Sequence, residues 1–149
     1  MVNAAGTAGT ANSHRSVDRR TLAAIAAGGA LGAPARYGIA QLVHVAPHTF
    51  PWATFWTNIS GSFALGVVMA LVLERFPPTR YVRPFVATGF LGAYTTYSTF
   101  AVEADLLVKD GRAGTGVAYA AATVVAGMAA VWGGILAARS LPHRTARTA

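Results

Sequence analysis

The sequence contains no cysteine, so it can form neither a disulfide framework nor a metal site built from thiolates. Walker A, GxGxxG and HExxH motifs are also missing, which removes the common signatures of nucleotide-dependent and zinc-dependent enzymes. Acidic side chains are scarce, with only five Asp and Glu among 149 residues. No nucleophile, base and orienting group can be assembled from what remains. We therefore expect a protein that is not an enzyme.

Charge is missing altogether from three long stretches, residues 37–73, 84–102 and 113–138. The chain is 54% apolar and only 11% charged, which is far more apolar than an ordinary soluble domain. A helix needs about 20 such residues to cross a bilayer. The first stretch is interrupted by the polar segment HVAPHTFP, and its N-terminal part continues an apolar run that starts at Thr21. The pattern predicts an all-α membrane protein with four spanning helices, at residues 21–43, 52–73, 83–107 and 115–138.

The basic residues predict the orientation of these spans. One side of the membrane would carry nine of them, namely Arg15, Arg19, Arg20, Arg75, Arg80, Arg83, Arg139, Arg144 and Arg147. The other side would carry only Lys109 and Arg112, partly offset by Asp105 and Asp110. The positive-inside rule therefore places both termini in the cytoplasm.

The same reading divides the chain into a disordered cytoplasmic tail at residues 1–18, a transmembrane domain at 19–138 and a second cytoplasmic tail at 139–149. The net charge of +7 is scattered over tails and loops rather than gathered on one face, so it does not indicate nucleic-acid binding.

The N-terminus permits a second interpretation, because it resembles a twin-arginine secretion signal. Arg19 and Arg20 precede an apolar stretch that ends in Ala33-Pro34-Ala35, a plausible cleavage position. Cleavage there would leave three spans and remove Gly28 and Gly32. The mass of the mature protein distinguishes the two interpretations.

Two polar side chains inside the predicted spans are candidates for function. Arg36 lies in the first span, where a buried cation is costly; it either has a functional or architectural role or snorkels to the interface. Asn58 lies in the second span among several Ser and Thr residues. Its amide either bonds a neighbouring helix or faces a polar path.

Small residues four apart predict close packing between helices in the membrane. The pairs are Gly28/Gly32, Ser62/Gly66 and Ala130/Gly134.

The third span contains the polar segment GAYTTYSTF at residues 92–100. A helix that is interrupted in mid-membrane frees backbone carbonyls, which are tolerated where they coordinate a cation or line a wet cavity. Tyr97 and Phe100 stand three residues apart on one helical face, and the positive edges of aromatic rings can contact an anion. Alternatively, the two rings are core residues and the hydroxyls bond carbonyls one turn earlier.

Taken together, these segments resemble the Fluc (CrcB) family of small fluoride channels. The resemblance rests on GGALGAPARYG in the first span, TNISGSFALG in the second and GFLGAYTTYSTFAVE in the third. It covers nearly all of residues 21–138, although the fourth span matches mainly in hydropathy and in Tyr119 and Thr123. The resemblance implies an antiparallel dimer of four-helix subunits, with a break in the third helix and two narrow pores. Fluoride would leave the cytoplasm of a prokaryote passively through the plasma membrane.

The resemblance also implies roles for individual residues. The pore and its polar lining would be formed by Asn58, Tyr97, Phe100, Ser98, Thr99, Tyr119 and Thr123. Backbone carbonyls of Gly92 and Thr95 from both subunits would bind a central structural sodium ion, and no organic cofactor is implied. Arg36 would lie near the dimer or vestibule surface, and Glu103 would lie toward a pore mouth.

Two features depart from the family pattern. Tyr97 stands where the family usually has Phe, and its hydroxyl adds length and a donor that would alter pore geometry and conduction rate more than selectivity. The strong charge bias is unlike that of a chain that inserts in both orientations to form an antiparallel homodimer. This bias suggests an obligate heterodimer with a homologue of opposite bias.

Two rival functions remain at this point. A small proton-coupled multidrug exporter is also a four-span antiparallel dimer, but it needs a carboxylate embedded in the membrane. The cores of the first, second and fourth predicted spans contain no Asp or Glu, and Glu103 and Asp105 lie near one end of the third span. A non-conducting membrane subunit would explain the small-residue pairs but would leave TTYSTF and Asn58 without a purpose.

Overall fold

The computed structural model describes residues 18–43, 45–74 and 80–141. Its helices, in chain order, are α1 (Arg19–Leu42), α2 (Trp52–Glu74), η1 (Pro84–Leu91), α3 (Gly92–Tyr94), α4 (Tyr97–Lys109) and α5 (Ala113–Ser140). With η1, α3 and α4 taken as one rod, these bounds lie within two residues of the predicted spans. Most of the two predicted tails lies outside the described residues, as do Arg15, Arg75, Arg144 and Arg147.

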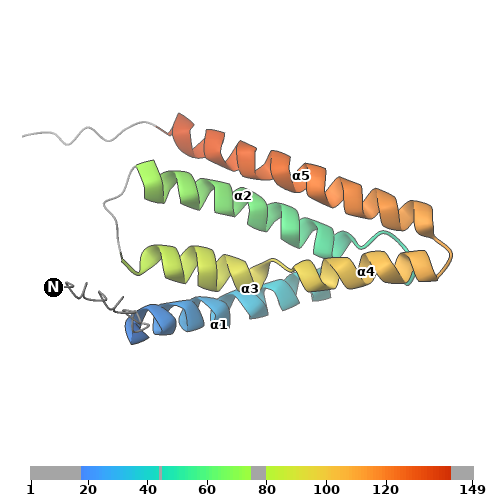
Figure 1. The fold of residues 1–149 in the computed structure, drawn as a ribbon, viewed down its shortest axis with the longest axis horizontal. Coiled ribbons are helices and arrows are strands. Elements are labelled where there is room, and N and C mark those ends of the chain that lie inside the picture. The colour runs from blue at the N-terminus through green and yellow to red at the C-terminus, as the bar shows by residue number, and fades with distance from the viewer. Residues whose placement is uncertain (1–17, 44, 75–79, 142–149) are drawn as a thin grey trace, which may run out of the picture.

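η1, α3 and α4 follow one another along a single line and together form one rod (Figure 1). With α1, α2 and α5, the bundle therefore has four rods that lie side by side. α2 packs along α5, α1 packs against η1 and α3, and α4 reaches α5. The start of α1 and the end of α5 lie at the same end of the bundle (Figure 1). The turn between α4 and α5 lies at the opposite end.

Asp18 explains why α1 begins at Arg19. Its carboxylate accepts hydrogen bonds from the backbone N–H of Arg20 and the hydroxyl of Thr21, both at 3.1 Å, and so caps two groups of the first turn. The hydrogen bond from Arg20 is the main cause that lowers the pKa of Asp18. Arg80 lies 3.0 Å from the same carboxylate, which ties the start of α1 to the segment before η1.

The predicted small-residue pairs are the places where helix backbones touch. A Cβ added to the buried Gly28 would collide with the carbonyl oxygen of Phe85, and one added to Gly32 with that of Phe90. On the other side of the bundle, Gly66 of α2 and Gly134 of α5 each press against a backbone carbonyl of the opposite helix. A side chain at these four positions would collide with the opposite backbone, so the prediction of close packing is confirmed at Gly28, Gly32, Gly66 and Gly134.

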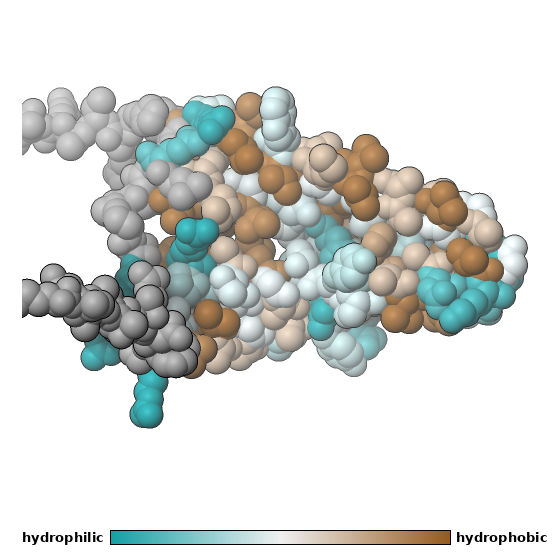
Figure 2. Space-filling model, viewed as in Figure 1, coloured by the Kyte–Doolittle hydropathy of each residue, from teal (hydrophilic) through white to brown (hydrophobic). Residues whose placement is uncertain are grey.

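The outside of the bundle is apolar, as expected for a membrane protein. Among the described helices, α2 and α5 are each long and apolar enough to cross a bilayer on their own, and few of their residues are buried inside the bundle. Leu31 is 58% exposed, and Met128 and Trp132 are each 70% exposed. Figure 2 shows such apolar side chains along the outer edge of α5. A water-soluble domain would bury side chains of this kind.

The third rod is not a continuous helix. η1 has wide turns of π type, in which the backbone N–H of Gly92 reaches the carbonyl of Ala87. The backbone is then extended at Thr95, with φ −77° and ψ 159°, and at Thr96, with φ −146° and ψ 121°. α4 starts directly afterwards with Thr96 as its N-cap, since the Thr96 hydroxyl accepts a hydrogen bond from the N–H of Thr99 at 3.1 Å.

Candidate functional site

The side chain of Asn58 bonds both backbone groups of Thr96. Asn58 Oδ1 accepts from the Thr96 N–H at 2.9 Å, and Asn58 Nδ2 donates to the Thr96 carbonyl at 3.0 Å. Gly61, one turn further along α2, allows this approach, because a Cβ there would collide with the Thr95 side chain. The second N–H of the Asn58 amide has no partner in the described part of the chain. Asn58 therefore bonds a neighbouring segment and still has one donor to offer.

These contacts release two carbonyl groups from the helical hydrogen-bond ladder. In a continuous helix, the Thr96 N–H would bond the Gly92 carbonyl, but here it bonds Asn58. Likewise the Thr99 N–H would bond the Thr95 carbonyl, but here it bonds the Thr96 hydroxyl. The carbonyl oxygens of Gly92 and Thr95 are thus freed at neighbouring positions of the interruption.

A groove of about 500 Å³ runs between α2, the interrupted rod and α5. Its lining brings together six of the predicted site residues, namely Asn58, Gly92, Thr95, Tyr97, Phe100 and Thr123. The rest of its wall is largely apolar and includes Leu65 and Val131. The groove therefore combines a few polar groups with largely apolar walls.

A line of aromatic rings leads from this groove into the bundle. The ring of Tyr97 is 6.0 Å from that of Phe100, which in turn lies 5.3 Å from the ring of Tyr119. Phe50 closes the line with its ring 5.2 Å from Tyr119, edge to face. Tyr97 is 81% exposed in the single chain, whereas Tyr119 is completely buried. Tyr97 and Phe100 do lie on one face of α4.

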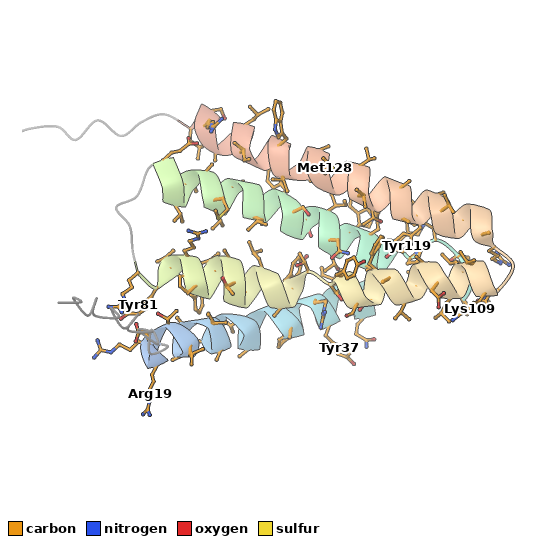
Figure 3. The ribbon with its side chains drawn as sticks, in the orientation of Figure 1. Arg19, Tyr37, Tyr81, Lys109, Tyr119 and Met128 are labelled. Atoms are coloured by element: carbon orange, nitrogen blue, oxygen red, sulfur yellow. The ribbon has the colours of Figure 1, made fainter. Side chains whose placement is uncertain are left out.

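Glu103 and Tyr119 form a polar pair beside this line of rings. The Tyr119 hydroxyl donates to Glu103 Oε2, and the Thr54 hydroxyl donates to Glu103 Oε1, each at 2.9 Å. Figure 3 shows the Tyr119 ring lying between α5 and α4. Glu103 also lines a second cavity of about 520 Å³, next to His48 and Asp110 of the loops. Tyr119 is not among the residues that line the first groove, where Thr123 stands instead with its hydroxyl bonded to the Tyr119 carbonyl at 2.7 Å.

Arg36 and Thr99 lie elsewhere, in a third cavity of about 240 Å³ between α1, α2 and the interruption. The hydroxyl-bearing residues around it are Tyr37, Thr54, Thr57, Thr96 and Thr99. Ser98 is exposed at the start of α4, with its hydroxyl 3.3 Å from that of Thr96. Apart from Ser98 and Tyr119, which line none of them, the predicted site residues are divided among these three cavities. Thr96 lines both the first and the third.

Comparison with known proteins places the chain in a family. The family model described as CrcB-like protein, Camphor Resistance (CrcB), matches residues 23–135. The chain belongs to the CrcB family. The family predicted from the sequence is therefore confirmed.

Among relatives of this CrcB chain, the fluoride-specific ion channel FluC 1 of Streptomyces coelicolor is 46% identical over 118 residues, which are 79% of this chain and 77% of the relative. FluC 2 of Nocardia farcinica is 43% identical over 123 residues, 83% of this chain and 88% of the relative. FluC 3 of Streptomyces avermitilis is 43% identical over 128 residues, which are 86% of this chain but 63% of the longer relative. Each carries the name of a fluoride-specific ion channel.

Sequence reasoning missed several contacts at the CrcB motif. Thr54 is one of the Ser and Thr residues around Asn58 in the sequence, and its hydroxyl donates to the Glu103 carboxylate. The spacing of Thr54 and Asn58, one helical turn apart, was the available signal, because it places both on the face of α2 that meets the third rod. The capping role of Thr96 had a signal too, since Thr before a helix is a favoured N-cap.

Proposed function

We propose that this chain is a fluoride-selective passive ion channel that lowers cytoplasmic fluoride by efflux across the plasma membrane of a prokaryote. The groove carries this proposal, because Asn58, whose amide has a spare donor, lines it together with Tyr97 and Phe100. The relatives named above are fluoride-specific ion channels rather than enzymes, and the proposed transport involves no chemical step. Hydrogen fluoride crosses a bilayer as a neutral molecule and ionises inside, so the anion needs such a path to leave.

The chemistry of the groove suits fluoride. Fluoride is small and holds its water tightly, so a selective path must replace that water with hydrogen-bond donors and still release the ion. The Asn58 amide and the positive edges of the Tyr97 and Phe100 rings are donors without full charge. Ser98, Thr99, Tyr119 and Thr123 would extend the polar path on either side. A fixed cation in the same place would hold fluoride more strongly and slow its exit.

The second proposal concerns assembly as an antiparallel dimer. In a single chain, the groove opens sideways, and Tyr97 and Met128 on its rim are 81% and 70% exposed. An anion in such a groove would face lipid, where its burial is costly. A partner subunit that covers the open side would complete the wall. The partner is either a second copy or, as the charge bias favours, a homologue of opposite topology.

The described basic residues support cytoplasmic termini. Arg19, Arg20, Arg80, Arg83 and Arg139 lie toward the end of the bundle that holds the start of α1 and the end of α5. Lys109 and Arg112 lie at the opposite end, where Asp105 bonds Lys109 at 2.7 Å. The positive-inside rule assigns the arginine-rich end to the cytoplasm. Arg36 would then lie near the outer part of α1, facing the third cavity as a vestibule residue.

The third proposal is a structural sodium ion bound by the Gly92 and Thr95 carbonyls of both subunits. The donor set fits, because these two carbonyls are relieved of their helical partners by Asn58 and Thr96. Neutral oxygens at a helix interruption are typical ligands of Na⁺ in membrane proteins. When bound, the ion would supply positive charge that holds the freed carbonyls at the dimer centre.

A growth experiment tests the channel proposal in cells. A bacterial strain without its own fluoride exporters is transformed with the gene for this chain and grown in medium that contains fluoride. Restored growth supports the proposal. The Phe100→Ile variant should not restore growth under the same conditions. Sensitivity that persists although the chain is present in the membrane, alone and with an opposite-topology homologue, would speak for the non-conducting subunit.

A further inference from the structure

A hydrogen bond between Ser60 and Tyr94 joins α2 to α3 just before the interruption. The two hydroxyl oxygens are 2.8 Å apart. Ser60 Oγ also lies 2.7 Å from the carbonyl of Trp56 and 3.2 Å from that of Thr57. A serine hydroxyl has a single hydrogen, which these carbonyls of its own helix claim, so Tyr94 is the donor to Ser60.

The ring of Tyr94 is held from its other side as well. It stacks on Phe90, with ring centres 6.0 Å apart and planes inclined by 5°. Gly61 leaves room on α2, because a Cβ there would lie 3.2 Å from Tyr94 Cδ1. Tyr94 is the last residue of α3 and is followed at once by the extended Thr95. Its side chain therefore has little freedom to move without moving the interruption.

Two side chains of α2 thus bond the chain on both sides of the interruption. Ser60 holds Tyr94 before it, and Asn58 holds Thr96 after it. Thr95 lies between these points, and its own N–H and hydroxyl both bond the Leu91 carbonyl at 2.9 Å. The direction of the freed Thr95 and Gly92 carbonyls therefore depends on where the bonds of Ser60 and Asn58 hold the backbone.

We infer that the Ser60–Tyr94 hydrogen bond positions the interruption for fluoride conduction. Neither residue is among those that line the groove, so both act through Thr95 and not by touching the ion. They are positioning residues, and their effect rests on the proposed channel function. α3 continues η1 directly and ends at Tyr94, so the Ser60–Tyr94 bond acts on the last turn of helix before the interruption.

The inference is tested with Tyr94→Phe, which keeps the stacked ring, and Ser60→Ala, which keeps the helix. Each variant, and the double variant, is purified as the assembled channel and its fluoride efflux from liposomes is measured per assembled channel. We expect each single variant to be slowed roughly three- to tenfold, the factor that corresponds to the loss of one hydrogen bond. The double variant should be no slower than the singles, because both remove the same bond.

Two further variants sharpen the comparison. Ser60→Thr keeps a hydroxyl at the same position and should restore efflux to near the original rate. Tyr81→Phe removes a tyrosine hydroxyl outside the helical rods and should leave efflux unchanged. The ratio of fluoride to chloride efflux is measured in parallel, and we expect it to fall in Tyr94→Phe, since a misplaced interruption discriminates less well.

The outcomes separate this inference from the channel proposal. If the unaltered chain conducts and both single variants match it in rate and selectivity, the positioning role is wrong. The same conclusion holds if the variants only assemble in lower yield, or if their effects multiply in the double variant. If the unaltered chain itself releases no fluoride, alone or with an opposite-topology homologue, the channel proposal fails and this inference falls with it.

Discussion

Replacing Asn58 with aspartate exchanges one amide group for a carboxylate oxygen and leaves the shape of the side chain almost unchanged. The bond from the Thr96 N–H to Oδ1, 2.9 Å long, can persist. The donor that reaches the Thr96 carbonyl at 3.0 Å is lost, and two oxygens then face each other. A buried acceptor left without a partner costs about 1–3 kcal/mol, so the interruption should be weakened but not lost.

The added charge has the larger effect on conduction. A fluoride ion about 4 Å from a carboxylate is repelled by about 4 kcal/mol at an effective dielectric constant of about 20. Since each 1.4 kcal/mol changes an equilibrium constant tenfold, occupancy beside residue 58 should fall about a thousandfold. We therefore expect Asn58→Asp to reduce fluoride efflux by at least about a hundredfold.

The assay is fluoride efflux from liposomes that contain the purified variant, followed with a fluoride electrode. Ser140→Asp is the matched control, because it adds the same charge at an exposed position at the end of α5. Gel filtration confirms that both variants assemble. Efflux through an assembled Asn58→Asp channel at the unaltered rate would show that Asn58 serves only to bond Thr96 and that no anion passes it.

Four further perturbations follow from the same contacts. Phe100→Ile removes the ring that lines the groove and should nearly abolish fluoride efflux with assembly intact by gel filtration; undiminished efflux would remove this ring from the mechanism. Tyr97→Phe should change the rate but not the selectivity in the liposome assay, and chloride leakage would contradict this. Gly32→Leu drives a side chain into the Phe90 backbone and should prevent recovery of folded protein; a normal yield would contradict the close packing of α1 and η1. Replacing sodium by a large organic cation during purification should lower efflux, whereas unchanged efflux would argue against a sodium ion on Gly92 and Thr95.

The helices were predictable from the sequence because each apolar, uncharged run is the length of one crossing. The polar segment HVAPHTFP divided the first run correctly, and α1 ends at Leu42, just before it. The small-residue pairs were predictable from their spacing alone, since small side chains four residues apart let two helix backbones approach closely in an apolar environment. The span boundaries and the small-residue pairs can each be read from a single segment of the sequence.

Contacts between segments were not predictable in the same way. The bonds of Asn58 to Thr96 and of Tyr119 to Glu103 join different helices, and a single sequence does not show which polar groups meet. The π-type turns of η1 left no signal in the sequence either, and they include Gly89, which packs closely against the backbone of α1. The motif named Asn58, Gly92 and Thr95 as candidates, but the structure was needed to show the bonds of Asn58 and Thr96 that leave the Gly92 and Thr95 carbonyls without their helical partners.

The most direct test of the channel account is selective efflux from liposomes loaded with equal fluoride and chloride, with valinomycin present to balance charge. The account predicts fast release of fluoride while chloride is retained, either by this chain alone or together with an opposite-topology homologue. Release of both anions at similar rates would contradict the proposed selectivity. Release of neither anion under either condition would contradict the channel function itself.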